Sequence, residues 1–450
     1  MYSPSDNSEC FLEIDKAKYD TSLDSSRGGV LTGKKWLEEV EILPSLWQQN
    51  NRRWAAPQHY TCSYLAMFPP ALPHYFIRRF TKSGDIVLDP FSGRGTTAVE
   101  AIAQGRIGIG NDLNDLAYVL TKGKLVNPNL DETLARLDEL EAGYSREDWL
   151  KFSGMPNKIR MIFHPETQKH LMYFKRELDW RNNDIDAFLS MVLMGAMHGQ
   201  SSGFLSLSMP NTFSMGWNYV KKYIAEHNLK RPKRDAFAVI RKRCKRHLKR
   251  GQLPGNGFAI HGDVRLLNQT PLIESNSVKM IFSSPPYLKV IKYGLYNWIR
   301  LWWLIGEHQS IDKKLDDEHS LEPYLNFMRE VMEITLPLLD KESGLACWVI
   351  GDVNNLNLAK IVWEKVGSKI EIPDSRGDGQ KYRLLGIVSD SIPDEEKVTK
   401  IWNSESDKSG KATLTDRILI ICPEKSDPRP YLSNSGIVWN PSESESKPLN

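Results

Sequence analysis

The feature that most constrains the fold is a glycine-rich stretch between two apolar runs. Residues 85–97 read DIVLDPFSGRGTT, a short apolar run that leads directly into glycines. An amphipathic run follows as far as Gly105, and residues 106–112 (RIGIGND) form a second apolar run that ends on Asp112. The pattern predicts a strand, a glycine loop, a helix and a second strand, which is the unit that builds doubly wound α/β sheets.

This unit predicts a ligand of the nucleoside type. Glycines let a ligand approach the backbone, and an acid at the tip of the next strand can accept bonds from ribose hydroxyls. The chain has no GxxxxGK[ST] phosphate loop, and Gly93-x-Gly95 lacks the third glycine of a dinucleotide loop. Asp89 would repel a pyrophosphate, whereas it suits a cationic ligand such as the ammonium and sulfonium groups of S-adenosylmethionine.

A second motif, SSPPY at 283–287, follows the apolar run 278–282. Its two prolines end strand pairing and leave a stiff loop. The hydroxyl of Ser284 and the carbonyl of Pro285 can accept N–H bonds from a planar amino heterocycle, and Tyr287 can stack on its ring. Taken alone, the pentapeptide is equally typical of a strand that ends in a proline turn.

Residues 123–255 interrupt the alternation of strands and helices. Residues 131–141 and 184–198 have helical apolar spacing. The run 221–250 holds thirteen Lys and Arg residues against two acids, a net charge of +11 in a chain whose total is +3. Such a run is usually a solvated helix face, but beside a nucleoside site it favours a phosphate-backbone contact surface. The predicted contact residues are Lys221, Lys222, Lys230, Arg231, Lys233, Arg234, Arg241, Lys242 and Arg243.

The alternation resumes in the last part of the chain. A strand over 257–264 contains Asp263, which could accept a bond from an adenine amino group or could cap a helix. The further predicted elements are the strand 278–282, a helix over 323–339, a buried strand over 344–352, and an antiparallel pair, 382–388 with 416–422, at a sheet edge. The serine- and proline-rich tail that follows is predicted to be disordered.

The whole chain sets a few outer bounds. Its 450 residues suggest two or three domains, or one domain with a large insertion. The five cysteines are scattered without a CxxC pair, which favours a reducing compartment and argues against a zinc site or a disulfide framework. The start has no secretory pattern and no window of eighteen apolar residues occurs, so we expect neither a secretory signal nor a membrane span.

Together these motifs resemble those of S-adenosylmethionine-dependent DNA methyltransferases that modify exocyclic amino groups. DPFSGRGTT at 89–97 is similar to the cofactor motif DPFxGxGTT, and SSPPY to the catalytic motif (D/N/S)PP(Y/F/W). The approach segment YLAMFPP at 64–70 resembles the additional cofactor-side motif. The resemblance covers roughly 55–125 and 257–422, and it implies a doubly wound, seven-stranded Rossmann-like methyltransferase sheet with a mainly helical insertion.

The order of the motifs implies a target-recognition region inserted between two halves of the methyltransferase domain. The expected divisions are an N-terminal extension (1–53), a cofactor-binding half (54–125), a helical and basic DNA-binding insertion (126–255), a catalytic half (256–425) and a disordered tail (426–450).

The resemblance also implies residue roles. The expected catalytic residues are Ser284, Pro285, Pro286 and Tyr287. The expected S-adenosyl-L-methionine-binding residues are Phe68, Asp89, Pro90, Phe91, Ser92, Gly93, Gly95, Thr96, Thr97, Asp112, Asp263 and Ser283. No metal is expected.

A serine in the first position of the catalytic motif is associated mainly with N4-cytosine methylation, so the expected target is a flipped cytosine in double-stranded DNA. Adenine N6 stays open as the target, as do an RNA base amine and a catalytically silent DNA-binding regulator. A cognate restriction endonuclease is an open candidate as a partner, and the expected location is the prokaryotic cytoplasm, at the nucleoid.

Overall fold

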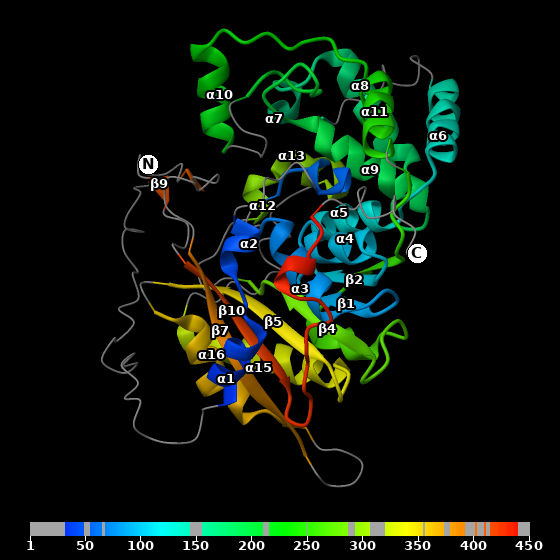
Figure 1. Cartoon of the computed structure of the whole chain (residues 1–450). Coiled ribbons are helices and arrows are strands. Elements are labelled where there is room, and N and C mark those ends of the chain that lie inside the picture. The colour runs from blue at the N-terminus through cyan, green and yellow to red at the C-terminus, as the bar shows by residue number, and fades with distance from the viewer. Residues whose placement is uncertain are drawn as a thin grey trace, which may run out of the picture.

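The protein is built around one β-sheet that has helices on both faces, with a helical layer above it in the view of Figure 1. The computed structural model describes residues 32–48, 55–64, 68–144, 155–209, 216–249, 251–286, 293–306, 320–353, 356–372, 379–391, 401–402, 409–410 and 415–439.

Seven strands form the main sheet in the order β3-β2-β1-β4-β5-β10-β7. The first five pair in parallel, and β10 runs antiparallel to β5 and β7. The short β6 pairs with β7 as an eighth, outer strand, and β8 pairs with β9 separately. The bounds are β1 (Ile86–Asp89), β2 (Ile107–Asp112), β3 (Gly257–His261), β4 (Val278–Ser283), β5 (Leu345–Gly351), β6 (Glu371–Ile372), β7 (Gln380–Ser391), β8 (Ile401–Trp402), β9 (Ser409–Gly410) and β10 (Thr415–Pro423). The predicted doubly wound, seven-stranded α/β fold is therefore confirmed.

The strand order reverses between β1 and β4. The chain runs from β1 through a helix to β2 on one side, whereas β4 lies on the other side of β1. In open α/β sheets, ligands bind beyond the carboxyl ends of the strands at such a switch point. Both sequence motifs begin there, because β1 ends at Asp89 and β4 ends at Ser283.

Two apolar cores cover the two faces of the sheet. Val87 packs with the first described helices of the chain. The next residue, Leu88, packs with helices that follow β4, since neighbouring strand residues point to opposite faces. The helices of the first face are α1 (Thr32–Val40), α2 (Pro44–Gln48) and α3 (Ala71–Phe80); those of the second are α15 (Leu321–Thr335) and α16 (Leu358–Lys365). The helices α4 (Thr96–Ala103) and α5 (Asp115–Leu125) follow β1 and β2.

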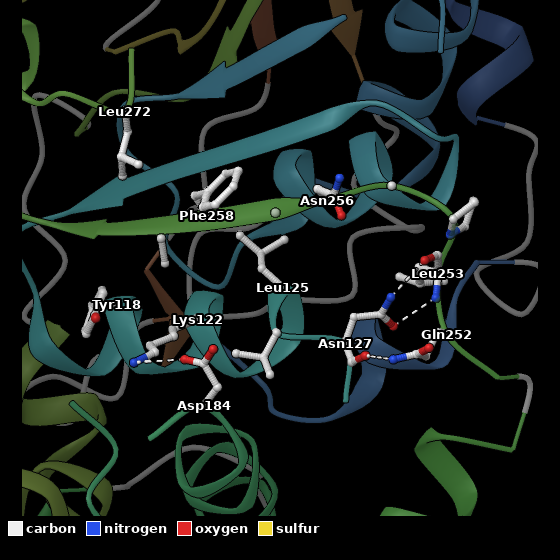
Figure 2. Close-up of a pocket in the computed structure, with 15 residues that line it drawn as sticks. Tyr118, Lys122, Leu125, Asn127, Asp184, Gln252, Leu253, Asn256, Phe258 and Leu272 are labelled. Atoms are coloured by element: carbon white, nitrogen blue, oxygen red, sulfur yellow. Dashed lines mark hydrogen bonds and ion pairs between the residues drawn. The ribbon is translucent and has the colours of Figure 1, made fainter. Parts of the chain in front are cut away.

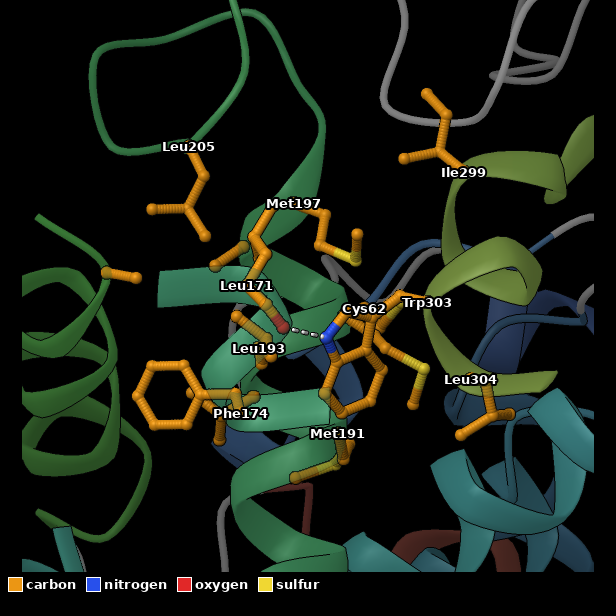
Figure 3. Packing of buried hydrophobic residues seen from close by; sticks show 14 of the residues in the cluster. Cys62, Leu171, Phe174, Met191, Leu193, Met197, Leu205, Ile299, Trp303 and Leu304 are labelled. Carbon is orange, nitrogen blue, oxygen red and sulfur yellow. Dashed lines mark hydrogen bonds between the residues drawn. The ribbon is translucent and has the colours of Figure 1, made fainter. Parts of the chain in front are cut away.

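A third apolar core holds the helical layer together. The indole Nε1 of Trp303 donates to the main-chain oxygen of Leu171 at 2.9 Å inside it (Figure 3). The helices of the layer are α6 (Leu130–Gly143), α7 (Asn157–Arg160), α8 (Pro165–Glu177), α9 (Asp184–Met197), α10 (Trp217–Glu226), α11 (Ala236–His247), α12 (Tyr293–Tyr296) and α13 (Trp298–Ile305). Because α12 and α13 follow β4, residues after the basic segment contribute to the same layer as α6 to α11.

The predicted antiparallel pair forms between β7 and β10. It lies toward one edge of the sheet, but β10 also pairs with β5 and is therefore an interior strand. Short 3₁₀ turns complete the described secondary structure: η3 (Pro57–Tyr60), η5 (Val264–Gln269), η6 (Leu336–Leu338), η7 (Gly367–Lys369) and η9 (Asn434–Gly436).

The prediction of a disordered tail from residue 426 is wrong for residues 426–439. The indole Nε1 of Trp36 donates to the Pro428 carbonyl at 3.1 Å, and a ring nitrogen of His74 lies 3.0 Å from the Val438 carbonyl. The ring of Trp439 stacks on His74 with centroids 5.1 Å apart. A polar average composition concealed these few anchoring contacts, and residues 440–450 lie outside the described part of the chain.

The N-terminal extension is also part of the fold where it is described. Trp36 of α1 and Trp47 of α2 are buried against the sheet. Cys62, Cys244, Cys347 and Cys422 are buried free thiols. None of the described helices combines the length and the apolar character that a membrane crossing requires.

Candidate active site

The two motifs meet in one hydrogen bond at the switch point. The Oγ of Ser283, at the end of β4, donates to Oδ1 of Asp89, at the end of β1, over 2.5 Å. Both side chains are buried. Residues 194 positions apart are thereby fixed against each other, so the glycine loop and the SSPPY loop leave the sheet side by side.

Asp89 is an acid without a cationic partner. Its side chain is 2% exposed, and burial raises its pKa to about 7, although bonds from Ser283 and from the Phe91 amide oppose that rise. Among the described residues no Lys, Arg or His forms an ion pair with Asp89 or with Asp112. Buried carboxylates normally have paired charge, so this arrangement suits a ligand that carries positive charge.

The glycine loop requires its glycines. Gly93 has φ +51° and Gly95 has φ +80°, both in the left-handed region that favours glycine. The Gly95 amide donates to the Ser92 carbonyl at 2.6 Å, and a Cβ added at Gly95 would lie only 2.9 Å from Oγ1 of Thr121. The loop therefore passes close to α5 before α4 begins at Thr96.

Asp112 holds the loop from the neighbouring strand. Its Oδ2 accepts the Gly93 amide at 2.8 Å, and its Oδ1 accepts the Asn114 amide at 2.9 Å. The side chain is half-buried, and burial raises its pKa to about 6 despite these bonds. Each carboxylate oxygen keeps further acceptor capacity, which matches the predicted contact to ribose hydroxyls.

The SSPPY loop, predicted to be catalytic, begins with an oriented serine. The Oγ of Ser284 donates to the Val349 carbonyl of β5 at 3.0 Å, which fixes the direction of its hydroxyl proton. Pro285 is buried and Pro286 is half-buried. Tyr287, the predicted stacking residue, lies outside the described residues.

Asp263 adopts the capping role that its position also allowed. It precedes η5, where its Oδ1 accepts the Arg265 amide at 2.9 Å. The Arg265 guanidinium lies 3.1 Å from Oδ2 of Asp263 and 2.6 Å from a carboxylate oxygen of Glu330. This acid is thus already paired, and its predicted contact to the cofactor remains a prediction.

The other predicted cofactor residues surround the loop. Phe68 lies edge-on to Phe282 with centroids 5.6 Å apart, and the Phe91 ring lies 5.8 Å from Phe327. The Pro90 carbonyl accepts Nδ2 of Asn111 at 3.1 Å. Ser92, Thr96 and Thr97 are buried at the loop and in the first turn of α4.

Three further residues position the loop: Tyr64, which lies in the predicted cofactor-side segment, and Asn114 and Lys124, which were missed in the sequence. The Tyr64 ring lies 3.6 Å from the place of a Cβ at Gly93, and its hydroxyl accepts Nδ2 of Asn114 at 3.2 Å. The buried Lys124 donates to the Arg94 carbonyl at 2.5 Å, and burial lowers its pKa well below the usual range. Asn114 could have been recognised as a helix cap, whereas the sequence around Lys124 gives no signal.

A buried His–Glu–His cluster lies at α4, the helix that follows the glycine loop. Glu100 of α4 lies 2.6 Å from His59 and 2.9 Å from His74. Burial would raise the pKa of Glu100, but the bonds with both histidines outweigh it and hold the pKa at about 2. The His59 carbonyl accepts a guanidinium N–H of Arg94 at 2.9 Å, so the cluster is connected to the loop.

The predicted phosphate-contact residues divide into three groups. Those with exposed side chains are Lys221, Lys222, Lys230, Arg231, Lys233 and Lys242. Arg234 is half-buried, and Arg241 is bound on both guanidinium nitrogens by Asp138 and Glu141 of α6. The prediction for Arg243 is wrong: its side chain points inward, is 8% exposed, and donates to the carbonyls of Gly195 at 3.1 Å and Gly203 at 3.0 Å.

A pocket of about 550 Å³ lies elsewhere, between α5 and the outer strand β3 (Figure 2). Its wall includes Tyr118, Phe258 and an ion pair of Lys122 with Asp184 at 3.4 Å. No residue of either motif lines it. The described residues contain no group of His, Cys, Asp and Glu that could hold a metal ion.

The sheet order, the switch point and the glycine loop define a Rossmann-like, doubly wound α/β fold. Residues 6–122 match a family model described as DNA methylase, of the N6 and N4 type, and this match supports the amino-methyltransferase family. The matched residues include the glycine loop and end before the SSPPY motif.

Curated relatives show the same similarity at low identity. The Type II methyltransferase M.BsoBI of Geobacillus stearothermophilus is 23% identical over 57% of this chain and 53% of its own length. The Type II methyltransferase M.MjaII of Methanocaldococcus jannaschii is 24% identical over 29% of this chain and 25% of its own length. The Type II methyltransferase M.MthZI of Methanothermobacter thermautotrophicus is 28% identical over 28% of this chain and 36% of its own length. The chain thus spans about half or less of the length of these relatives.

Among solved structures, the rRNA methyltransferase aviRa from Streptomyces viridochromogenes matches with 12% identity over 86% of this chain and 95% of its own. The TM-score of 0.30 is too low to support any argument from that likeness.

Proposed function

We propose that this protein is a DNA methyltransferase that transfers a methyl group from S-adenosylmethionine to an exocyclic base amine, with cytosine N4 as the preferred atom. The observation that carries the proposal is the Ser283–Asp89 bond, because it brings the cofactor-type loop and the amine-type loop to one switch point. The similarity to DNA methylases and to Type II methyltransferases supports DNA as the substrate.

The residues present fit the cofactor. S-adenosylmethionine supplies an activated methyl group on a sulfonium, and its ammonium and sulfonium are the positive charges that the unpaired Asp89 lacks. Gly93 and Gly95 leave the backbone open to a close approach, and Asp112 offers acceptors for ribose hydroxyls. We assign cofactor binding to these residues together with Tyr64, whose ring lies against the loop at Gly93.

The SSPPY loop would act on the amine. An exocyclic amine is a poor nucleophile because its lone pair is delocalised into the ring. Acceptors on both N–H groups draw that lone pair out and stabilise the positive charge that develops on nitrogen. We assign these acceptor roles to the Ser284 oxygen, whose proton is engaged by Val349, and to the Pro285 carbonyl.

The target base must leave the duplex, since its amine is paired there. Flipping costs a few kcal/mol, and stacking on an aromatic ring is worth about 1–3 kcal/mol by analogy with single-strand binders. We assign this stacking to Tyr287. The Type II relatives also favour a restriction–modification role, in which methylated sites are protected from a cognate endonuclease.

The test is to incubate the purified chain with isotopically labelled S-adenosylmethionine and, separately, duplex DNA and RNA, followed by nucleoside mass spectrometry. The expected product is N4-methylcytosine in DNA. N6-methyladenine would move the assignment to adenine, and a methylated RNA base would replace DNA as the substrate. If the chain bound the cofactor but methylated no nucleic acid, the proposal would be refuted.

A further inference from the structure

Helix α10 presents one continuous outer stripe. Its inner face is apolar: Val220 is buried, and Trp217 and Tyr223 are half-buried against the helical core. The exposed positions recur every three or four residues and therefore lie on one side of the helix. They are Asn218, Lys221, Lys222 and Ala225, followed at the end of the helix by Glu226, which lies 3.6 Å from Lys222.

The composition of this stripe suits the floor and walls of the major groove. An asparagine amide can bond the N6 and N7 edge of adenine, and a small apolar side chain can contact the methyl group of thymine. Lysines beside them can neutralise phosphates. Asn218 lies in the first turn of α10, and helices that read DNA commonly contact base edges with residues of their N-terminal turns.

Helix α11 offers an informative contrast. Its exposed side carries only cations apart from Ala238, namely Lys242, Lys245 and Arg246, and the exposed Lys249 follows just after the helix. Such a stripe can bind phosphates on any sequence, but it has no neutral donor and acceptor pair for a base edge. Two basic helices of one segment therefore differ in chemistry: α11 is suited to hold the duplex, and α10 is suited to read it.

The position of α10 also favours this role. The ring of Trp217 lies edge-on to that of Trp298 with centroids 6.3 Å apart, and Nζ of Lys158 lies 5.2 Å from the same Trp298 ring. Trp298 begins α13, which follows the SSPPY loop in the chain. In Figure 1, α10 stands at the outer margin of the helical layer, and α12 and α13 lie between it and the sheet.

We propose that α10 is the helix with which this protein reads DNA sequence: Asn218 contacts a base edge, and Lys221 and Lys222 contact the flanking phosphates. The proposal rests on the proposed function for its substrate, duplex DNA. It goes further because it assigns sequence reading to one face of one helix and excludes α11 from it.

The experiment selects bound duplexes from a pool with randomised positions and sequences them, so it does not depend on methyl transfer. The wild-type chain is expected to enrich a defined sequence. Asn218→Ala should reduce the preference at one base-pair position by about 10- to 100-fold, the worth of one bidentate contact. Asn218→Asp, which removes the amide donors, should shift the preference at that position toward cytosine.

Matched variants separate reading from holding. The pair Lys221→Ala with Lys222→Ala should weaken binding equally for all sequences and reduce the slope of log affinity against log salt by about 2. The pair Lys242→Ala with Lys245→Ala on α11 should do the same and leave the sequence preference intact. Cofactor affinity, measured by calorimetry, should stay unchanged in every variant.

The proposal is overturned if Asn218→Ala keeps the wild-type preference at every position, if the α11 pair removes that preference, or if the wild-type chain binds duplexes without any preference. Failure of the proposed function gives a different result. In that case the selection would still reveal a sequence that depends on Asn218, while no labelled methyl group would reach DNA.

Discussion

The sequence predicts functional residues both at the carboxyl edge of the sheet and in the basic segment 221–250. The two regions differ in how well the sequence predicts the environment of each side chain. At the sheet edge, Asp89, Asp112, Ser283 and Ser284 each bond to another defined group of the protein. In the basic segment, residues that look alike in the sequence have three different environments. Parallel strands bring their ends to a common edge, whereas a charge count does not show which way each side chain of a helix points.

Two neighbours in α11 show this difficulty within the basic segment. Lys242 is exposed, but Arg243, one residue later, is buried and bonded to two carbonyls. A step of one residue rotates the side chain by about 100° around the helix, and this carries it from solvent to core. Variants at the two regions should therefore change different properties, and four experiments test this contrast.

The largest expected effect is that of Asp89→Asn on stability. The pKa of Asp89 is about 7 in the folded chain against 3.8 for an ordinary Asp, so the folded form retains a proton that the unfolded chain releases. The unfolding free energy of the wild type therefore falls as the pH rises from about 4 to about 7. Asn cannot ionise, so the variant should be more stable at pH 8 by about 4 kcal/mol, at 1.36 kcal/mol per pKa unit.

Denaturant unfolding at pH 5 and pH 8 measures this difference, which should shrink at the lower pH. The same variant should bind S-adenosylmethionine more weakly, and wild-type affinity should fall as the pH drops below 7 because Asp89 becomes neutral. Equal stabilities of wild type and variant at pH 8 would show that the acid is ionised and compensated in some other way.

Ser284→Ala should affect turnover. Removal of one group that stabilises developing charge usually costs about 100- to 1000-fold in kcat. Cofactor affinity should change little, because the Ser284 hydroxyl bonds to the Val349 carbonyl of β5. Single-turnover methylation and calorimetry measure the two quantities, and equal losses in both would refute the assigned role.

In the basic segment, Arg243→Met should lower the unfolding free energy by about 1–3 kcal/mol, because it leaves the buried Gly195 carbonyl without this donor and also removes the bond to the Gly203 carbonyl. Lys242→Met, the matched exposed variant, should change stability by less than about 0.5 kcal/mol. Denaturant unfolding of both variants tests the contrast. Similar values for the two would mean that the inward bonds of Arg243 contribute nothing to stability.

The smallest effect should come from Lys242→Ala combined with Lys245→Ala. Stability should not change, whereas the slope of log affinity against log salt should fall by about 2, since each lysine removed leaves one phosphate without its cation. Fluorescence anisotropy with a labelled duplex at salt concentrations between about 50 and 200 mM measures it. An unchanged slope would remove this face of α11 from the DNA contact surface.

The sequence predicted the strand, glycine loop, helix and strand of residues 85–112 well, because the contacts of this unit are local or follow from strand ends. β1, the glycine loop, α4 and β2 lie consecutively in the chain, and parallel pairing brings Asp89 and Ser283 together. By contrast, the support from Lys124, His59 and Glu100 depends on side chains that meet only through tertiary packing. The inward turn of Arg243 and the interior place of β10 have the same origin.

The tail shows another limit of composition. Residues 426–439 are polar on average, yet single contacts of Pro428, Val438 and Trp439 hold them in place. Asp263 shows a third limit, since a strand-end acid serves equally well as a cap, and the structure has it capping η5.

The contact between Trp36 and Pro428 has a consequence for biosynthesis. A ribosome releases α1 almost four hundred residues before its partner, so during translation the buried face of α1 lacks the segment that completes it. Contacts so distant in sequence also form slowly, because a long loop must close first. We expect α1 to stay incompletely packed until the segment around Pro428 emerges, and a ribosome stalled before that point should hold a chain in which the region of α1 is protease-sensitive.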